Sequence, residues 1–258
     1  MGTAIPAAAS SRADVRAHGK LVVLCFPDTN SPFLSKRAGG EYGGVDVAIL
    51  RSFAVGLHVP LVVQEVKTFG ELLPALARGD GDVAAGGLSI TPERQKLADF
   101  SRPYFPVAVM VIARRDKGIK TVDDLAGKRG AAVPGTTHEA LMRQRGVTPT
   151  VALAHAGEAY QALRDDRADF AFVDSTSGVV SLDRYPGLVL VGMLPTADYY
   201  GFAVARGSDL RGALDHHLAQ IRQQGLLYSI FTRELGPQAV KLYELFRQST
   251  GGAPNPLP

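Results

Sequence analysis

The stretch GLSITPERQKLADFSRPYF, residues 87–105 of this chain, contains an unusually complete helix start. In Thr91-Pro92-Glu93, the threonine can cap free amide hydrogens, the proline fits the first turn, and the glutamate offsets the positive end of the helix dipole. We therefore predict that a helix begins at Pro92. Its first turn then carries Arg94.

Arg94 is the side chain in this stretch that suggests a binding site. The exposed amides of a helix start and the planar fork of a guanidinium both favour a carboxylate or another anion. Gly87 permits a close approach of a ligand to the backbone, and Ser89 offers a hydroxyl beside it. The local chemistry leaves one alternative open, in which Arg94 forms a surface ion pair with Asp99 or Glu93.

Composition excludes several other classes of protein. Hydrophobic residues make up 46% and charged residues 21% of the chain, which is ordinary for a globular protein and not for a disordered or fibrous one. The net charge of +3 is spread along the chain without a basic stripe, so we expect no nucleic-acid partner. The single cysteine, Cys25, cannot form an intramolecular disulfide or a multi-cysteine zinc site.

The sequence predicts no metal site and no cofactor. His216 and His217 are neighbours, so on a helix their side chains would point about 100° apart. Two ligands of one metal ion prefer positions i and i+4 on a helix. We expect both histidines at the surface.

Short apolar runs alternate with amphipathic segments along the chain, a pattern typical of an α/β fold. Pro74 shortens one predicted helix, because proline inside a helix removes a hydrogen bond. The apolar run at 106–114 is long for a strand in one sheet, so we expect it to cross between two lobes. Strands are predicted at 21–26, 61–66, 82–86, 129–133, 150–154, 169–174 and 199–206, and helices at 47–57, 69–79, 138–146, 157–166 and in three segments ending near Arg247.

A short internal repeat indicates two similar lobes. ALARGDGDVA (75–84) and ALRDDRADFA (162–171) align at a constant offset of 87. The same offset pairs Gly87 with Asp174, so both predicted strands would deliver their carboxyl ends to comparable places. In open α/β sheets these ends form the ligand crevice. Chance similarity of two βα turns is the alternative.

The tract from Ser89 to Tyr104, S-I-T-P-E-R followed by D-F-S and P-Y, resembles the signature of the bacterial extracellular solute-binding proteins of family 3. These are type II periplasmic receptors that deliver polar amino acids to ABC transporters. Matching segments follow in order over roughly residues 20–247. The resemblance implies an α/β fold of two lobes joined by two crossing strands, with 15–108 and 203–250 in lobe 1, 109–202 in lobe 2, and tails at 1–14 and 251–258.

The resemblance also implies a two-sided clamp for an amino acid. Arg94 would grip the α-carboxylate of the ligand, and Ser89 and the backbone of Gly87 would help to hold it. Asp174, at the end of the strand in RADFAFVD, would take the α-ammonium group. Opposite charges on the two lobes suit a zwitterion and stabilise a closed state only when the ligand bridges them.

Further contacts to the carboxylate would come from the second lobe. The family uses a GTT-like tract at a helix N-terminus for this purpose. In this chain the tract is Gly135, Thr136 and Thr137.

One position departs from the family pattern. Members commonly carry an aromatic residue two positions before the P-F of the first βα loop, where it stacks on the ligand, and this chain has Asn30 there. Phe69 matches another aromatic of the family pocket and is the expected replacement wall. Tyr199 and Tyr200 are further candidates to face the cleft.

The predicted function is capture of a small polar ligand, most simply an amino acid, for uptake by a membrane ABC permease, without catalysis. The resemblance implies a monomer that is periplasmic or extracellular, or tethered to a membrane in a longer chain. IPAAAS (5–10) looks like the surroundings of a signal-peptide cleavage site, which agrees with such a location. The ligand itself is left open by the sequence.

An alternative is a ligand-binding module of a larger enzyme or sensor. Cyclohexadienyl dehydratases resemble these binding proteins but use a glutamate shortly after the second-lobe aspartate, and here Ser175, Thr176 and Ser177 follow Asp174. Some lytic transglycosylases carry such a domain before a lysozyme-like module. The Gly/Pro-rich tail leaves that arrangement open.

Overall fold

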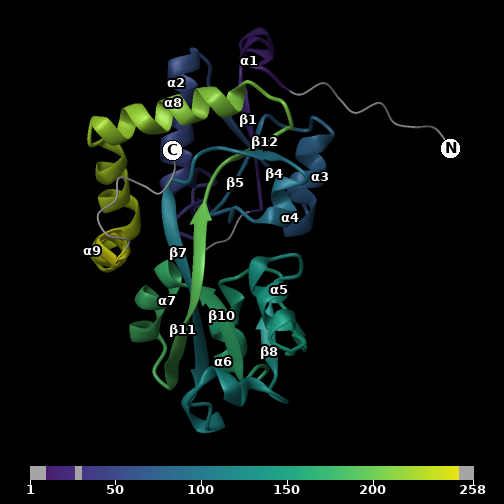
Figure 1. The fold of residues 1–258 in the computed structure, drawn as a ribbon, viewed down its shortest axis with the longest axis vertical. Coiled ribbons are helices and arrows are strands. Elements are labelled where there is room, and N and C mark those ends of the chain that lie inside the picture. The colour runs from purple at the N-terminus through teal and green to yellow at the C-terminus, as the bar shows by residue number, and fades with distance from the viewer. Residues whose placement is uncertain (1–9, 27–30, 250–258) are drawn as a thin grey trace, which may run out of the picture.

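The computed structural model describes residues 10–26 and 31–249, which form two lobes, each built on a five-stranded sheet. Figure 1 shows the two lobes one above the other, with β7 and β11 passing from one lobe to the other. The lobe 1 sheet has the order β4-β1-β5-β12-β6, and the lobe 2 sheet has the order β11-β7-β10-β8-β9. The strands of lobe 1 are β1 (Leu21–Cys25), β4 (Leu61–Glu65), β5 (Val83–Ala85), β6 (Asp99–Phe100) and β12 (Ala203–Val204); those of lobe 2 are β7 (Phe105–Arg114), β8 (Gly130–Ala132), β9 (Val151–Ala152), β10 (Phe170–Asp174) and β11 (Leu188–Tyr200).

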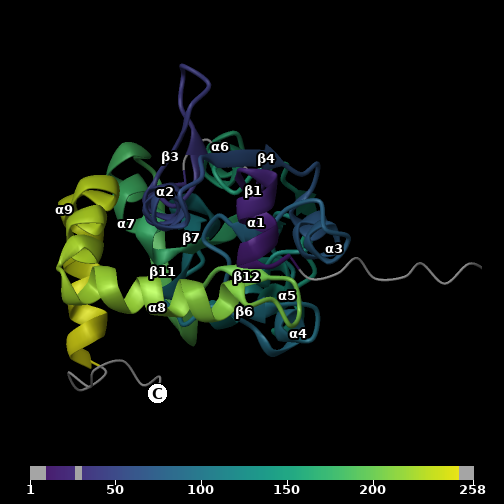
Figure 2. The same ribbon diagram turned by 90° about the horizontal axis from the view of Figure 1, so that it is seen from above.

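Helices cover both faces of the lobe 1 sheet. Along β1, Leu21, Val23 and Cys25 pack on one side and Leu24 on the other, as the two-residue period of a strand requires. The first side is covered by α1 (Arg12–His18), α2 (Val45–Leu57), α8 (Leu210–Gln223) and α9 (Leu226–Ser249), and the second by η1 (Phe69–Glu71) and α3 (Leu72–Ala77). A hairpin of β2 (Ser35–Lys36) and β3 (Tyr42–Gly43) projects from this lobe (Figure 2).

The lobe 2 sheet is also buried on both faces. Met110 and Ile112 of β7 pack with α6, whereas Val109 and Val111 pack with Met142 of α5. Burial on both sides explains why 106–113 is apolar throughout. The helices of this lobe are α5 (Thr137–Gln144), α6 (Glu158–Arg164) and α7 (Ser175–Ser181), with single turns at η2 (Arg115–Lys117), η3 (Val122–Leu125) and η4 (Leu182–Arg184).

Two antiparallel strands connect the lobes, as predicted. β7 and β11 pair from Phe105↔Tyr200 to Arg114↔Leu188. Where they reach lobe 1, Tyr200 also bridges to Ser89. The exact residue boundaries of the lobes stay a prediction.

The single strand predicted at 199–206 is wrong. β11 ends at Tyr200 in the lobe 2 sheet, and Ala203 begins β12 in the lobe 1 sheet. Gly201 lies at the change of sheet, where its N–H donates to Leu88 O at 3.1 Å and a Cβ would lie 2.8 Å from Ile90. Local apolarity could not show the break, because both pieces are buried strands.

The internal repeat is matched by equivalent hydrogen bonds in the two lobes. At the start of β5, Asp82 Oδ2 accepts from Val22 N at 2.7 Å. At the start of β10, Asp169 Oδ2 accepts from Arg129 N at 2.8 Å. Each aspartate therefore ties its own strand to the neighbouring parallel strand, which gives the matched aspartates a common structural role.

The three predicted C-terminal helices correspond to α8 and the two halves of α9, which is kinked at Gly236, with φ 76° and ψ 169°. The expectation that His217 lies at the surface is wrong. It is half-buried, with its ring 5.5 Å from that of Phe53, and burial lowers its pKa.

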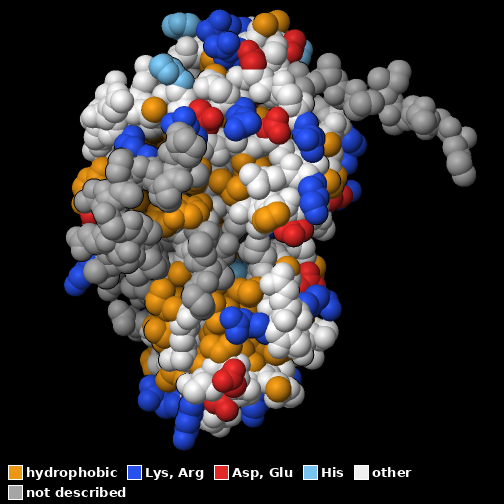
Figure 3. All heavy atoms as spheres, in the orientation of Figure 1, with side chains coloured by type: hydrophobic (Ala, Val, Ile, Leu, Met, Phe, Trp, Pro, Cys, Tyr) orange, Lys and Arg blue, Asp and Glu red, His pale blue; other side chains and the backbone are white. Residues whose placement is uncertain are grey.

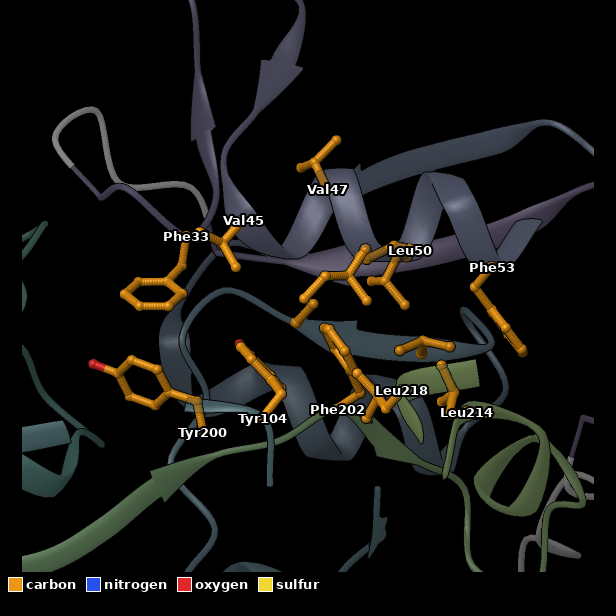
Figure 4. Close-up of a cluster of buried hydrophobic side chains, with 14 of the residues drawn as sticks. Phe33, Val45, Val47, Leu50, Phe53, Tyr104, Tyr200, Phe202, Leu214 and Leu218 are labelled. Atoms are coloured by element: carbon orange, nitrogen blue, oxygen red, sulfur yellow. The ribbon is translucent and has the colours of Figure 1, made fainter. Parts of the chain in front are cut away.

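An aromatic cluster connects the core of lobe 1 to the region between the lobes. Phe33 and Tyr200 meet edge to face with ring centres 4.7 Å apart, and Tyr104 stacks on Phe202 at 4.7 Å (Figure 4). All four side chains are buried. The end of β11 is thereby held firmly where it leaves lobe 2.

Candidate ligand-binding cleft

Two adjoining cavities lie between the lobes, at the carboxyl ends of β5 and β10. The small chamber has a volume of about 90 Å³ and the large chamber about 290 Å³. Residues common to both are Ser31, Gly86, Gly87, His138, Ala156 and Asp174. Gly87 and Asp174, which the repeat pairs, thus both lie on the wall that the two chambers share.

Arg94 is held by two contacts in the small chamber. It lies in α4 (Pro92–Gln95), whose predicted start at Pro92 is confirmed, and Thr91 caps the helix by accepting from Arg94 N at 3.2 Å. The guanidinium Nη1 donates to Ser89 O at 2.9 Å, and its carbon lies 5.1 Å from the ring centre of Phe69. Because α4 is one turn long and its cap already occupies the Arg94 amide, the side chain rather than the helix end is suited to an anion.

Asp174 faces Arg94 from the second lobe, at the junction of β10 and α7. His138 Nε2 lies 3.0 Å from its Oδ1, and the Tyr200 hydroxyl also hydrogen-bonds to this carboxylate. Burial opposes ionisation of Asp174, but His138, Tyr200 and the positive charge of Arg94 outweigh it, so its pKa lies below the ordinary value. The carboxylate is therefore charged at neutral pH.

His138 was not among the residues predicted from sequence. It is the second residue of α5, directly after the GTT tract, and its side chain is 12% exposed. The sequence offered one signal for a site role of His138, which is its position in the first turn of the helix that begins with the GTT tract. Only the fold brings it to Asp174, which is 36 residues away.

The backbone of Gly87 is set by a buried carboxylate. Asp46, in the first turn of α2 and 1% exposed, accepts from Gly86 N at 2.8 Å and from Gly87 N at 2.9 Å through Oδ2. Its Oδ1 accepts from the Tyr104 hydroxyl. Burial raises the pKa of Asp46 to about 6, against the opposing effect of these three hydrogen bonds.

Two residues of the GTT tract line the small chamber, and the third lies where the two lobes approach each other. Thr136 and Thr137 line the small chamber, and the Thr136 hydroxyl caps α5 by accepting from Glu139 N at 3.3 Å. Gly135 lines neither chamber. Its N–H donates to Glu139 Oε2 at 2.8 Å, and a Cβ on it would lie 3.4 Å from the Gly70 Cα of lobe 1.

Aromatic rings from both lobes meet at the small chamber. Phe69 lines it, and its ring centre lies 6.3 Å from that of Phe26. His155 of lobe 2 stacks on Phe26 at 5.1 Å. Asn30 lies outside the described residues.

Figure 3 shows basic and acidic side chains interspersed on the face it displays. Within 10–26 and 31–249, no group of three or more His, Cys, Asp or Glu side chains could hold a metal ion. No helix of the described chain is long and apolar enough to cross a membrane.

The sequence profile of the bacterial extracellular solute-binding proteins, family 3, matches residues 22–237. The chain belongs to this family. Amino-acid-binding protein AabA from Dichelobacter nodosus is 29% identical over 195 residues, which cover 73% of this chain and 77% of that protein. A solved structure of the P235GK mutant of ArgBP from T. maritima has a TM-score of 0.82 and 28% identity, covering 88% of this chain and 100% of that one.

Some relatives carry the name of an enzyme and are longer than this chain. Membrane-bound lytic murein transglycosylase F from Desulfosudis oleivorans is 29% identical over 231 residues. The match covers 85% of this family 3 chain but 49% of the relative. The chain thus spans about half the length of that enzyme.

Proposed function

We propose that this protein captures a small α-amino acid, or a related carboxylate, between its two lobes and presents it to a membrane ABC permease. The observation that carries the proposal is the placement of Arg94 and Asp174 on the wall of one chamber, from opposite lobes. A zwitterion has the matching charges. Membership of family 3 supports the same class of function.

Arg94 binds the α-carboxylate in this proposal. Its contacts with Ser89 O and Phe69 limit the directions that the guanidinium can take, which lowers the entropy cost of binding. Asp174 binds the α-ammonium. Its lowered pKa keeps it charged, and a charged carboxylate forms the stronger hydrogen bond.

The remaining predicted site residues take supporting roles. Ser89 and Thr137 supply further hydrogen bonds to the ligand, and Phe69 supplies an apolar wall. The Gly87 N–H bonds to Asp46 and the Thr136 hydroxyl donates to Val133 O, so these two residues offer acceptor oxygens only. We assign Gly135 to closure of the cleft, since it approaches Gly70 across the lobes. Asn30 is proposed to replace the stacking aromatic of the family with a side chain that forms hydrogen bonds.

We propose that no chemistry follows binding. Ser175, Thr176 and Ser177 supply no carboxylic acid after Asp174 for proton transfer. The protein would act as a monomer outside the cytoplasmic membrane. A ligand-binding module of a larger enzyme is the second candidate, favoured by the extended match to transglycosylase F.

Calorimetry with the twenty amino acids tests the proposal. We expect at least one ligand to bind the wild-type protein, and Arg94→Gln and Asp174→Asn each to weaken it about 100-fold, because each leaves a charge of the ligand unpaired in the closed cleft. A matched control is Arg211→Gln, an exposed arginine on α8, which should leave affinity unchanged.

Two results would contradict the proposal. If a ligand bound and its affinity survived Arg94→Gln, the role of Arg94 would be wrong. Turnover of prephenate or arogenate by the wild-type protein would show an enzyme instead of a binding protein.

A further inference from the structure

The large chamber extends beyond the residues of the clamp. Arg94, Phe69, Thr136 and Thr137 line only the small chamber, whose volume is about 90 Å³. The large chamber begins at the same Asp174 and adds about 290 Å³. If the proposed function holds, the α-carboxylate and α-ammonium occupy the small chamber, and the side chain of the ligand has room to extend past Asp174.

The lobe 2 wall of the large chamber combines an aromatic surface with hydroxyl groups. Tyr160 and Tyr185 stack with ring centres 5.2 Å apart and planes 12° from parallel. The Tyr160 hydroxyl donates to Ser177 Oγ at 3.4 Å, and Ser177 Oγ donates to Asp174 O at 3.0 Å. This wall suits methylene groups of a ligand while offering polar atoms beside them.

The charges around the large chamber are unequally compensated. Glu234, on the lobe 1 side, pairs with Arg37 at 3.4 Å and Arg233 at 2.8 Å. Asp174 is bonded to His138. Arg184 lines the same chamber, is exposed, and makes no ion pair with any residue that the structure describes. Among the described residues that line this chamber, Arg184 is therefore the one arginine or lysine, and no ion pair within the described part of the chain competes for it with an anionic group of a ligand.

We infer that the large chamber is a distal subsite for an anionic group, and that the ligand is an α-amino acid with an acidic side chain. The methylene groups would lie along Tyr160 and Tyr185, and the distal carboxylate would pair with Arg184. A guanidinium matches a carboxylate with two parallel hydrogen bonds, so Arg184 would determine specificity and add affinity.

A series of acids and their neutral counterparts tests this inference. Calorimetry would compare aspartate, glutamate and 2-aminoadipate, which differ by one methylene each, with asparagine and glutamine. We expect one of the acids to bind about tenfold more tightly than the neutral ligands, which corresponds to about 1.4 kcal/mol. Arg184→Gln should abolish that preference without changing the affinity for the neutral ligands. Arg184→Lys should retain part of it, and Arg211→Gln all of it.

The outcomes separate the subsite from the clamp. Suppose that neutral amino acids bind with an affinity that depends on Arg94. If the acidic ligands then bind no more tightly than the neutral ones, or if Arg184→Gln leaves their higher affinity unchanged, the subsite is refuted while the clamp stands. If no amino acid binds the wild-type protein at all, the proposed function and the subsite both fail. Thermal melting of each variant verifies that it is folded.

Discussion

The carboxylate of Asp46 accepts a hydrogen bond from the backbone N–H of Gly87, with 2.9 Å between the two atoms. This bond connects the first turn of α2 to the glycine that borders both chambers. Gly87 has φ 67°, in the left-handed region that glycine adopts readily. A buried carboxylate that itself lines neither chamber therefore helps to determine how the Gly87 backbone faces the cleft.

Asp46→Asn is expected to change how stability depends on pH. In the folded protein the pKa of Asp46 is raised from 3.8 to about 6, mainly by burial. A raised pKa means that the folded state holds the proton more tightly, so the stabilisation is complete below about pH 4 and is lost as the pH rises through 6. Relative to Asp46→Asn, the wild-type free energy of unfolding should fall by roughly 2 kcal/mol between pH 4 and 7 in urea titrations.

Tyr104→Phe provides the matched comparison for Asp46. The Tyr104 hydroxyl lowers the pKa of Asp46, so its removal should raise that pKa further and extend the loss of stability to higher pH. Equal pH profiles for the wild type and Asp46→Asn would show that Asp46 does not titrate in this range.

Gly135→Ala should weaken ligand binding by hindering closure of the cleft. Gly135 has φ 79°, and an added Cβ would lie 3.4 Å from the Gly70 Cα in the opposite lobe. We expect about 1 kcal/mol of lost stability from the backbone strain and an additional loss of affinity of about tenfold. Calorimetry and small-angle scattering with and without ligand would measure the two effects.

Gly146→Ala is the control for that substitution. Gly146 has a similar φ of 74°, but nothing lies within 4 Å of its Cβ position. The Gly146→Ala variant should lose about as much stability as Gly135→Ala while keeping the ligand affinity of the wild type. An equal loss of affinity in both variants would argue against a role of Gly135 in closure.

His138→Ala should make binding more sensitive to acid. His138 bonds to Asp174 and is one of the groups that lower the pKa of that carboxyl, so without it the pKa rises towards the ordinary value. Because the ammonium group needs an ionised partner, affinity should begin to fall at a higher pH as the solution is acidified. Titrations from pH 7 to 4 would be compared with His216→Ala, whose histidine is exposed on α8. If the affinity of the wild type and of His138→Ala fell identically between pH 7 and 4, an effect of His138 on the pKa of Asp174 would be ruled out.

Gly44→Ala should strongly destabilise lobe 1. Gly44 has φ 111°, and a Cβ there would lie 2.5 Å from the carbonyl oxygen of Phe33, a backbone atom that cannot move aside easily. The expected loss is roughly 3 kcal/mol. Gly44 is the N-cap of α2, and Gly56 near the end of that helix has open space at its Cβ position. Gly56→Ala should therefore stabilise the protein by about 0.5 kcal/mol. Chemical unfolding of both variants measures the contrast, and equal stabilities would refute it.

The sequence alone determined the fold class, the helix start at Pro92 and the position of most strands. These features depend on local chemistry: capping groups, proline geometry and the two-residue period of buried strands. The internal repeat by itself also relates Gly87 to Asp174. The family resemblance then connected both residues to a clamp.

Only the tertiary structure decided which groups meet across the cleft. His138 reaches Asp174 at the end of β10 from α5, Asp46 reaches Gly87 across 41 positions, and the strand expected at 199–206 divides between two sheets. Such contacts depend on how the lobes pack, because hydrogen bonds between distant residues leave no period in the sequence. In GLSITPERQKLADFSRPYF the helix start is a local property, whereas the direction of Arg94 depends on Ser89 and Phe69 around it.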